Sequence, residues 1–432
     1  MGLQTRHNQG VVVSFWPLGR RRTHAPDARR LCGMATTACG PLGPHLDTFA
    51  ETLTEKGYSS ATVALKVRVA AKFGDWLGRR RLAVGEVDEQ AVVRFVQCHP
   101  CSPRRGDAAT LRDLLELVRS AGLAPPAPTK VDDTTIGRIV SAFGRYLLVD
   151  RGLSISTRIS YLPIVRTFLA ERFDSGEPHL EALGHRDAGE FLVRHAHTVH
   201  PTRAGLMVSA LRGFLRWVHL RGDVAADLAA TVPSVAYWRL ATVPKSIPAR
   251  DVEQLLRRCR RRSEAGLRDY AILMLMARLG LRGGEVVALA LGDFDWEAGT
   301  LRVHGKGGRQ DLLPLPTDVG EAVARYLRHG RHACSCRNVF VRARAPRRAF
   351  ASTVAICTIV RRALERAGLN PPHKGGHILR HALACSMLRR GATLTEIGQV
   401  LRHRRADTTS IYAKVDIGAL RVLAPAWPGG GR

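Results

Sequence analysis

An internal repeat in the first half of the chain constrains the fold more than any other feature of the sequence. Gly57-Tyr58-Ser59-Ser60-Ala61-Thr62 is followed by apolar residues at helical spacing, and Gly152-Leu153-Ser154-Ile155-Ser156-Thr157 is followed by the same pattern. In both copies a glycine ends one helix and a Ser/Thr cluster caps the next. The copies also end alike, at Gly122 and Gly222, with a small loop insertion in between. We therefore predict two similar bundles of about four helices each.

The chain has 432 residues, which is too long for one hydrophobic core and suits about three domains. The Pro-rich segment Ala124-Pro125-Pro126-Ala127-Pro128 indicates a stiff linker between the two bundles. Met34 is an alternative start of the chain. The predicted segments are a disordered basic arm (1–40), a first helical domain (44–123), a second helical domain (136–222), a linker (223–248), a third domain (249–416) and a C-terminal tail (417–432).

From Asp251 onward the pattern is mixed. We expect helices at Asp251–Arg262 and Tyr270–Leu279 and a short helix from about Gly284. A hairpin follows, with strands at Thr300–His304 and Asp311–Leu315 around the turn Gly305-Lys306-Gly307-Gly308. The remainder reads as helical, and Thr393-x-x-Glu396 has the form of a capping box. The predicted fold class is mainly α with a small β-hairpin, the third domain being α+β.

The charge of the chain indicates a polyanionic partner. Lysine and arginine number 66 against 37 aspartates and glutamates, which gives a net charge of +29. Each basic side chain placed on a phosphate releases a condensed counterion, so such an excess favours nucleic-acid binding. The excess of positive charge is not confined to one removable tail, which favours nucleic-acid binding. The alternative interpretation is an arginine-rich proteome, which would produce a similar composition.

Cysteine usage and hydropathy exclude several classes of protein. Nine cysteines, an odd number, indicate reduced thiols. The groups Cys98-His99-Pro100-Cys101 and His332-Ala333-Cys334-Ser335-Cys336 lack a second pair at zinc-finger distance, so we predict no metal site. No apolar run approaches the roughly 18–20 residues of a membrane span, and no secretory signal is present. We expect a cytoplasmic protein that does not bind membranes.

Two basic residues lie where they could act on a phosphate. Arg282 stands between a glycine turn and the start of a short helix, with Glu285 one turn further on to brace it. Lys306 lies at a hairpin tip between glycines, where its ammonium could protonate a leaving oxygen. Taken singly, a surface arginine and an ordinary turn lysine are the simpler readings.

The C-terminal region adds further candidates. His377 and Arg380 share one face at the start of a helix, with His381 beside them as a supporting residue. A short loop separates His403 from Tyr412, which is the candidate nucleophile. Its phenol has a pKa near 10, so attack on a phosphodiester needs a base or dense positive charge nearby. A structural His/Arg pair and a core tyrosine are the alternative readings.

In the order Arg, Lys, His-x-x-Arg, His, Tyr, these residues resemble the catalytic domain of the tyrosine recombinases, also called phage-type integrases. The resemblance covers about 251–415 and is carried by the segments Leu279-Gly280-Leu281-Arg282-Gly283-Gly284-Glu285, Gly305-Lys306-Gly307-Gly308-Arg309, His377-x-Leu379-Arg380-His381, Leu401-Arg402-His403 and Thr408-Thr409-x-x-Tyr412. One position departs from the family pattern. The family usually has glycine where Arg402 stands, so the helix end there is expected to be altered.

The resemblance implies a site-specific DNA recombinase that cuts and rejoins double-stranded DNA through a 3′-phosphotyrosyl intermediate, without a cofactor. It implies Tyr412 as nucleophile, with Arg282, Lys306, His377, Arg380 and His403 as the other catalytic residues. The tandem bundles resemble the family's SAM-like core-binding domain, duplicated as in transposon- and plasmid-borne integrases. A homo-tetramer on DNA, or an assembly with sister recombinases, is implied. Relaxation of DNA in the manner of a type IB topoisomerase and a non-catalytic DNA-binding accessory protein are the alternatives.

Overall fold

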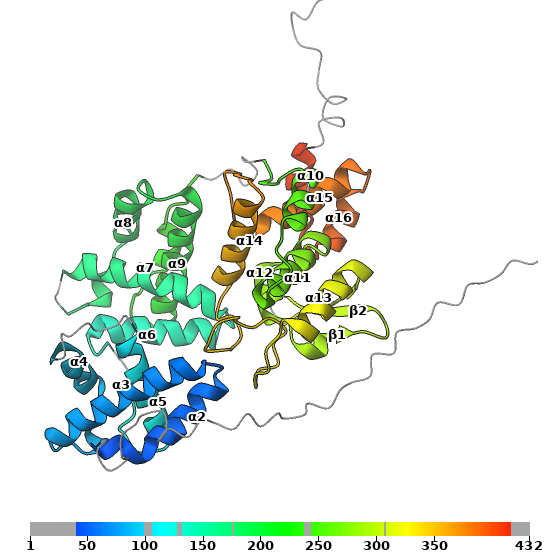
Figure 1. The fold of residues 1–432 in the computed structure, drawn as a ribbon. Helices are drawn as coiled ribbons and strands as arrows, with labels where there is room; N and C mark the ends of the chain where they lie inside the picture. Colours follow the sequence, from blue (N-terminus) through cyan, green and yellow to red (C-terminus); the bar gives the residue numbers. More distant parts are fainter. Residues whose placement is uncertain are drawn as a thin grey trace, which may run out of the picture. The chain divides into compact units, whose positions relative to one another are not determined.

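The computed structural model describes residues 40–98, 106–127, 132–174, 177–236, 243–305 and 308–415. The predicted arm up to residue 39, the predicted tail at 417–432, the His99-Pro100-Cys101 part of the first cysteine group and Lys306 lie outside these ranges. Within them the chain is mainly helical and contains a small three-stranded sheet (Figure 1), so the predicted fold class is confirmed. In this part of the chain no helix is both long and apolar enough to cross a membrane.

The first segment of the chain is a helical bundle around an aromatic core. Its helices are α2 (Leu46–Glu55), α3 (Ser60–Arg79), α4 (Glu89–Cys98) and α5 (Asp107–Ser120), with the short 3-10 helices η2 (Gly40–His45) and η3 (Val84–Glu86). Phe73, Trp76 and Phe95 are buried, with ring centroids 5.1–5.9 Å apart. Aromatic rings in such edge and offset contacts contribute beyond their buried area.

The second segment repeats this plan. Its helices are α6 (Thr135–Leu148), α7 (Ile155–Phe173), α8 (Asp187–Ala196) and α9 (Pro201–Leu220), with the 3-10 helices η4 (Leu180–Ala182) and η5 (Leu228–Thr231). Phe143, Phe168 and Phe214 are each at most 1% exposed, and Phe214 contacts both of the others edge-on.

The caps predicted from the repeat are confirmed in both copies. Gly57 and Gly152 have φ of 81° and 57°, the left-handed region that a side chain disfavours. Ser59 accepts a hydrogen bond from the backbone N–H of Thr62 (3.4 Å), and Ser154 accepts one from Thr157 (3.3 Å). The same glycine and serine therefore set the start of α3 in one copy and of α7 in the other.

The third segment contains the apolar helix α11, against which α10, α12, α13 and α14 pack. Its helices are α10 (Ala249–Arg257), α11 (Glu264–Arg278), α12 (Gly283–Ala288), α13 (Thr317–His329), α14 (Val354–Arg366), α15 (His377–Arg389) and α16 (Leu394–Val400), with the 3-10 helices η6 (Leu291–Asp293), η7 (Ala406–Thr408) and η8 (Ser410–Val415). Leu273, Leu275 and Met276 are fully buried on different faces of α11. A helix that is apolar all round is typical of a core position, and α13 packs beside it.

The sheet is antiparallel in the order β1 (Phe294–Asp295), β2 (Thr300–His304) and β3 (Gln310–Pro314). Leu301 pairs with Leu313 and Val303 with Asp311 across the hairpin. The predicted strand at Thr300–His304 is confirmed, and the second strand begins one residue earlier than predicted. Strand β1 was not predicted, because two residues are too few to show an alternating pattern.

Two predicted helix boundaries were wrong. The helix expected to reach Arg262 ends at Arg257, since Cys259 is buried and its N–H bonds to Leu256 in a turn. Helix α11 begins at Glu264 rather than at Tyr270, because Ser263 accepts from the Gly266 N–H (3.1 Å) and caps it there. The capping box at Thr393 and Glu396 is confirmed by its reciprocal hydrogen bonds.

The chain divides into two compact units. One contains the described residues up to Ala127 together with Ser246–Ser386 and Val400–Arg402. The other contains the described residues between 132 and 245, together with Met387–Gln399 and residues 403–415. The domain boundaries given above stay a prediction.

The core of the second bundle gives a test with a matched pair of substitutions. Leu211→Ala removes a side chain of α9 with no exposed surface, and should cost about 2–5 kcal/mol through lost transfer energy and a residual cavity. Leu220→Ala, on the same helix but 67% exposed, should change the free energy of unfolding by less than about 0.5 kcal/mol. Hydrogen exchange of the α9 amides in urea isolates this bundle from the rest of the chain. Equal costs for the two variants would contradict the assigned core.

Candidate active site

Arg282 stands at the N-cap of α12 and is held by Glu285. Its backbone is extended (φ −77°, ψ 150°). The Glu285 carboxylate accepts from the backbone N–H of Arg282 through Oε2 (2.9 Å) and from Arg282 Nη1 through Oε1 (2.7 Å). The carboxylate is buried, whereas the Arg282 side chain is 37% exposed. The bracing predicted for Glu285 is therefore confirmed, and it leaves the guanidinium partly open to solvent.

A second guanidinium shares the same carboxylate. Arg402 Nη2 donates to Glu285 Oε2 at 2.8 Å, and the Arg402 side chain is 3% exposed. Burial raises the pKa of Glu285, but the hydrogen bond from the Arg282 backbone and the charges of Arg402 and Arg282 outweigh it, so the pKa lies below its ordinary value. Glu285 is consequently ionised at neutral pH.

Arg402 was the position at which the sequence departs from the family pattern. Its φ is 53°, in the left-handed region that glycine favours. The N–H of His403 donates to Gly398 O (2.9 Å) across it, the bond of a left-handed helix C-cap. The expected alteration of the helix end is therefore not seen in the backbone, which forms the left-handed C-cap that glycine favours.

His377 and Arg380 lie at the start of α15, as the sequence predicted. Arg380 is 3% exposed, and its two Nη atoms donate to the carbonyls of Gly280 and Leu401. His377 reaches the surface, yet partial burial lowers its pKa, and the charges of Arg380 and Arg282 lower it further. These three predicted residues therefore lie together. The ring centroid of His381 is 6.2 Å from that of His377.

His403 and Tyr412 meet in the other unit. Their rings stack with centroids 6.4 Å apart and an interplanar angle of 4°. His403 Nδ1 is hydrogen-bonded to Thr409 Oγ1 at 2.8 Å, and Tyr412, on η8, is 1% exposed. The contact of Thr409 with His403 was not predicted, although Thr409 stands three residues before the tyrosine in the motif. Lys306 lies outside the described residues, so its placement is not part of this geometry.

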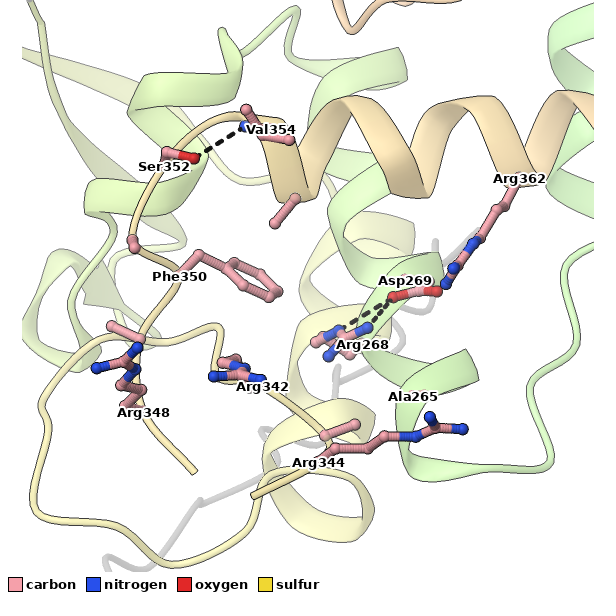
Figure 2. A pocket seen from close by; sticks show the side chains of 14 residues that line it. Ala265, Arg268, Asp269, Arg342, Arg344, Arg348, Phe350, Ser352, Val354 and Arg362 are labelled. Atoms are coloured by element: carbon pink, nitrogen blue, oxygen red, sulfur yellow. Dashed lines mark hydrogen bonds and ion pairs between the residues drawn. The ribbon is translucent and has the colours of Figure 1, made fainter. Parts of the chain in front are cut away.

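An arginine-lined cavity of about 620 Å³ lies near the N-terminal end of α11 (Figure 2). Its basic residues are Arg268, Arg342, Arg344, Arg348 and Arg362. The acid among the lining residues is Asp269, and Arg268 already binds it at 2.7 Å. This cavity was not predicted from the sequence. The signal was the arginine-rich run between residues 342 and 348, which the chain's overall basic composition concealed.

The described residues offer little to a metal ion. No three His, Cys, Asp or Glu side chains among them converge in a way that would hold one. Cys334 and Cys336 are free thiols with sulfurs 3.0 Å apart, and Arg331 contacts the first of them. The expectation that the protein works without a cofactor stays a prediction.

Comparison with known proteins identifies the family. Residues 245–418 match the model of the phage integrase family. The chain is 43% identical over 391 residues to the integrase/recombinase y4rA of Sinorhizobium fredii, a match that spans 90% of this chain and 95% of the relative. The chain belongs to the phage integrase family. It is thus a tyrosine recombinase, an enzyme of site-specific DNA recombination.

A second relative of this recombinase belongs to the same class of enzyme. The tyrosine recombinase XerD of Mycobacterium leprae is 30% identical over 305 residues, covering 66% of this chain and 94% of the relative. Among solved structures, XerH bound to palindromic difH in a post-cleavage complex has a TM-score of 0.57 at 17% identity and covers 69% of this chain and 98% of that one. A lambda integrase tetramer on a Holliday junction has a TM-score of 0.50 at 16% identity, covering 72% and 87%. At these identities the two structures support the fold alone.

The lowered pKa of His377 gives a pH prediction. Because the pKa is below its ordinary value of about 6.5, the unfolded chain binds more protons than the folded one between the two values. The contribution of His377 to stability is therefore complete above the ordinary pKa and is lost as the pH falls through the folded value. Arg282→Gln removes one of the charges responsible and should move the His377 midpoint upward.

An NMR titration of the imidazole signals, assigned with His377→Gln, measures this midpoint. Arg250→Gln is the control, since Arg250 is 87% exposed and contacts Asp251 instead. A His377 midpoint at or above its ordinary value in the unmodified protein would contradict the assignment.

Proposed function

We propose that this recombinase cuts and rejoins DNA through a 3′-phosphotyrosyl intermediate, in the integration or transposition of a mobile element. The observation that supports this most is the grouping of Arg282, His377 and Arg380, where two guanidinium charges help to lower the pKa of an imidazole. Fixed positive charges beside a neutral base suit attack on a phosphodiester, because the pentacoordinate phosphorane carries extra negative charge.

The phenol oxygen of Tyr412 bonds to the scissile phosphorus while the bond from phosphorus to O5′ breaks, which leaves a 3′-phosphotyrosyl link and a free 5′-hydroxyl. His377 accepts the phenol proton, and Lys306 donates a proton to the leaving O5′. The link retains the energy of the broken bond, so rejoining needs no ATP.

The remaining groups stabilise charge. Arg282 and Arg380 neutralise the non-bridging oxygens, and His403 donates a hydrogen bond to one of them. Tyr412 is 1% exposed and stacked on His403, so the phenol reaches DNA only after η8 moves. We infer that DNA binding accompanies this movement.

The arginine-lined cavity supports a DNA partner. Five arginines and one aspartate, which is already paired with Arg268, line this cavity, so its lining carries an excess of positive charge (Figure 2). Guanidinium groups bind phosphate oxygens bidentately and supply affinity independent of sequence. We propose that this cavity holds backbone phosphates of the DNA that flanks the cleavage site.

The wider assembly is part of the same proposal. Residues 136–222 form the core-binding domain, and residues 44–123 form an additional DNA-binding or assembly domain. Cleaving two duplexes and exchanging their strands calls for four active subunits, so we propose a homo-tetramer on DNA or an assembly with sister recombinases. We place the reaction in the bacterial cytoplasm, at the nucleoid.

The nucleophile can be tested directly. A pool of nicked duplexes with randomised arms serves as the substrate, and covalent adducts are isolated on denaturing gels and sequenced. Tyr412→Phe should abolish adducts while leaving the affinity for DNA unchanged, because only the phenol oxygen is lost. Tyr270→Phe is the control, since it keeps the ring that stacks on Arg261 (4.1 Å) and should form adducts normally.

Adducts formed by Tyr412→Phe would contradict the nucleophile, and their absence in the unmodified protein would contradict the proposed reaction. The same assay separates the alternatives. A topoisomerase would form adducts without enrichment of any sequence and would relax supercoiled plasmid. A non-catalytic accessory protein would bind DNA and form none.

The cavity can be tested by the salt dependence of binding. Losing one phosphate contact reduces the slope of log K against log salt concentration by about 0.9. Arg362→Gln, which alters the cavity lining, should show this loss on a random-sequence duplex. Arg361→Gln, one residue away on α14, should not, because Arg361 lies outside the cavity and contacts Glu365 (3.8 Å). Fluorescence anisotropy over a range of KCl concentrations measures both slopes, and equal slopes would exclude the cavity as a DNA contact.

A further inference from the structure

The buried guanidinium of Arg402 has contacts that glycine at this position cannot make. Its Nη1 lies within hydrogen-bond distance of the carbonyls of Leu279 (3.4 Å) and Val400 (3.3 Å), and its Nη2 binds Glu285. Arg380 bridges the two adjacent carbonyls, those of Gly280 and Leu401. The two arginines therefore join the same pair of backbone segments, and Arg402 also binds the carboxylate that holds Arg282.

The way Glu285 holds Arg282 differs from two other arginine–glutamate pairs of this chain. Arg119 binds Glu89 through both Nη atoms and both carboxylate oxygens (2.6 and 2.9 Å), and Arg278 binds Glu253 in the same bidentate way (2.6 and 3.1 Å). Bidentate pairing is the favoured geometry of an arginine with a carboxylate.

Arg282, by contrast, gives Glu285 only one guanidinium nitrogen, Nη1. The second oxygen, Oε2, is taken by the Arg282 backbone N–H and by Arg402. Arg282 makes no other side-chain hydrogen bond within the described residues, and its side chain is 37% exposed. Because Arg402 occupies Oε2, the rest of the Arg282 guanidinium is available to another anion.

Charge leads to the same conclusion. A carboxylate and one guanidinium form a neutral pair, whereas Glu285 with Arg282 and Arg402 carries a net charge of +1. The Arg402 charge is buried beside the carboxylate, where screening by water is weak. An anion at Arg282 therefore meets a net positive group instead of a neutral one.

We propose that Arg402 is a positioning residue. It occupies one oxygen of Glu285, so that Arg282 binds Glu285 through Nη1 only and can offer the rest of its guanidinium to the scissile phosphate. This inference rests on the proposed role of Arg282 in phosphodiester cleavage. The left-handed backbone at Arg402 directs the side chain into the buried position and keeps the helix C-cap that precedes His403.

The test uses the full chain and the nicked duplex selected in the adduct assay. Arg402→Gly removes the guanidinium and relaxes the backbone, and Arg402→Met removes it while filling much of the same space. Both should slow single-turnover cleavage by about 10- to 100-fold, the usual effect of losing a supporting partner, with the affinity for DNA unchanged. Arg81→Gly is the matched control, because Arg81 is also left-handed (φ 55°) after a helix but is exposed. It should cleave at the normal rate.

Two readouts separate positioning from a structural role. On a duplex with a neutral methylphosphonate at the scissile position, the deficit of Arg402→Gly should shrink, since the charge that Arg282 would neutralise is absent. In an Arg282→Gln background, Arg402→Gly should have no further effect on the rate. An equal deficit on both substrates, or an additive loss in the double variant, would overturn the proposal.

A crystal structure of Arg402→Gly without DNA gives a readout that does not depend on activity. We expect Arg282 to bind both oxygens of Glu285 through two guanidinium nitrogens. A contact still made by Nη1 alone would overturn the proposal even if the protein cleaves no DNA. Failure of the unmodified protein to form adducts would instead count against the proposed function.

Discussion

The buried carboxylate of Glu285 binds two guanidinium groups and a backbone N–H, and the local geometry around Arg282 depends on it. A carboxylate with so little access to water must be compensated by donors, and here they come from parts of the chain more than a hundred residues apart. A left-handed arginine costs roughly 1–2 kcal/mol. The buried contacts of Arg402 with Glu285 and with the carbonyls of Leu279 and Val400 offset this cost at a position suited to glycine.

The same region holds one arginine that is anchored to the backbone and another that is partly exposed. Arg380 is 3% exposed and donates from both Nη atoms to backbone carbonyls, so it joins the turn before Arg282 to Leu401. Arg282 stands at the edge of that framework with a partly exposed side chain. His377 lies beside both, and partial burial together with the two positive charges lowers the pKa of its imidazole. Rigid anchoring on one side and exposure on the other are what a phosphate-binding site requires.

Local signals in the sequence were sufficient for part of the fold. The glycines and serines of the repeat predicted the starts of α3 and α7, because left-handed backbone and N-caps are decided by neighbouring residues. The hairpin was predicted because its two strands flank a glycine-rich turn, which is also a local signal. The start of α11 was missed because its capping serine, Ser263, precedes the apolar stretch that drew the prediction. The arginine-lined cavity was missed because a basic run does not reveal whether its side chains converge.

The sequence by itself determined the family, the mainly helical fold and the inventory of residues suited to phosphoryl transfer, since these follow from residue types at fixed spacings. It placed Arg282, His377 and Arg380 on the correct helix starts. Only the tertiary structure decided that Arg402 reaches Glu285, that Arg380 is enclosed and that Tyr412 is buried against His403. Those outcomes depend on which distant segments share a buried carboxylate or a ring face. Long-range packing fixes such contacts, and they leave no local pattern in the sequence.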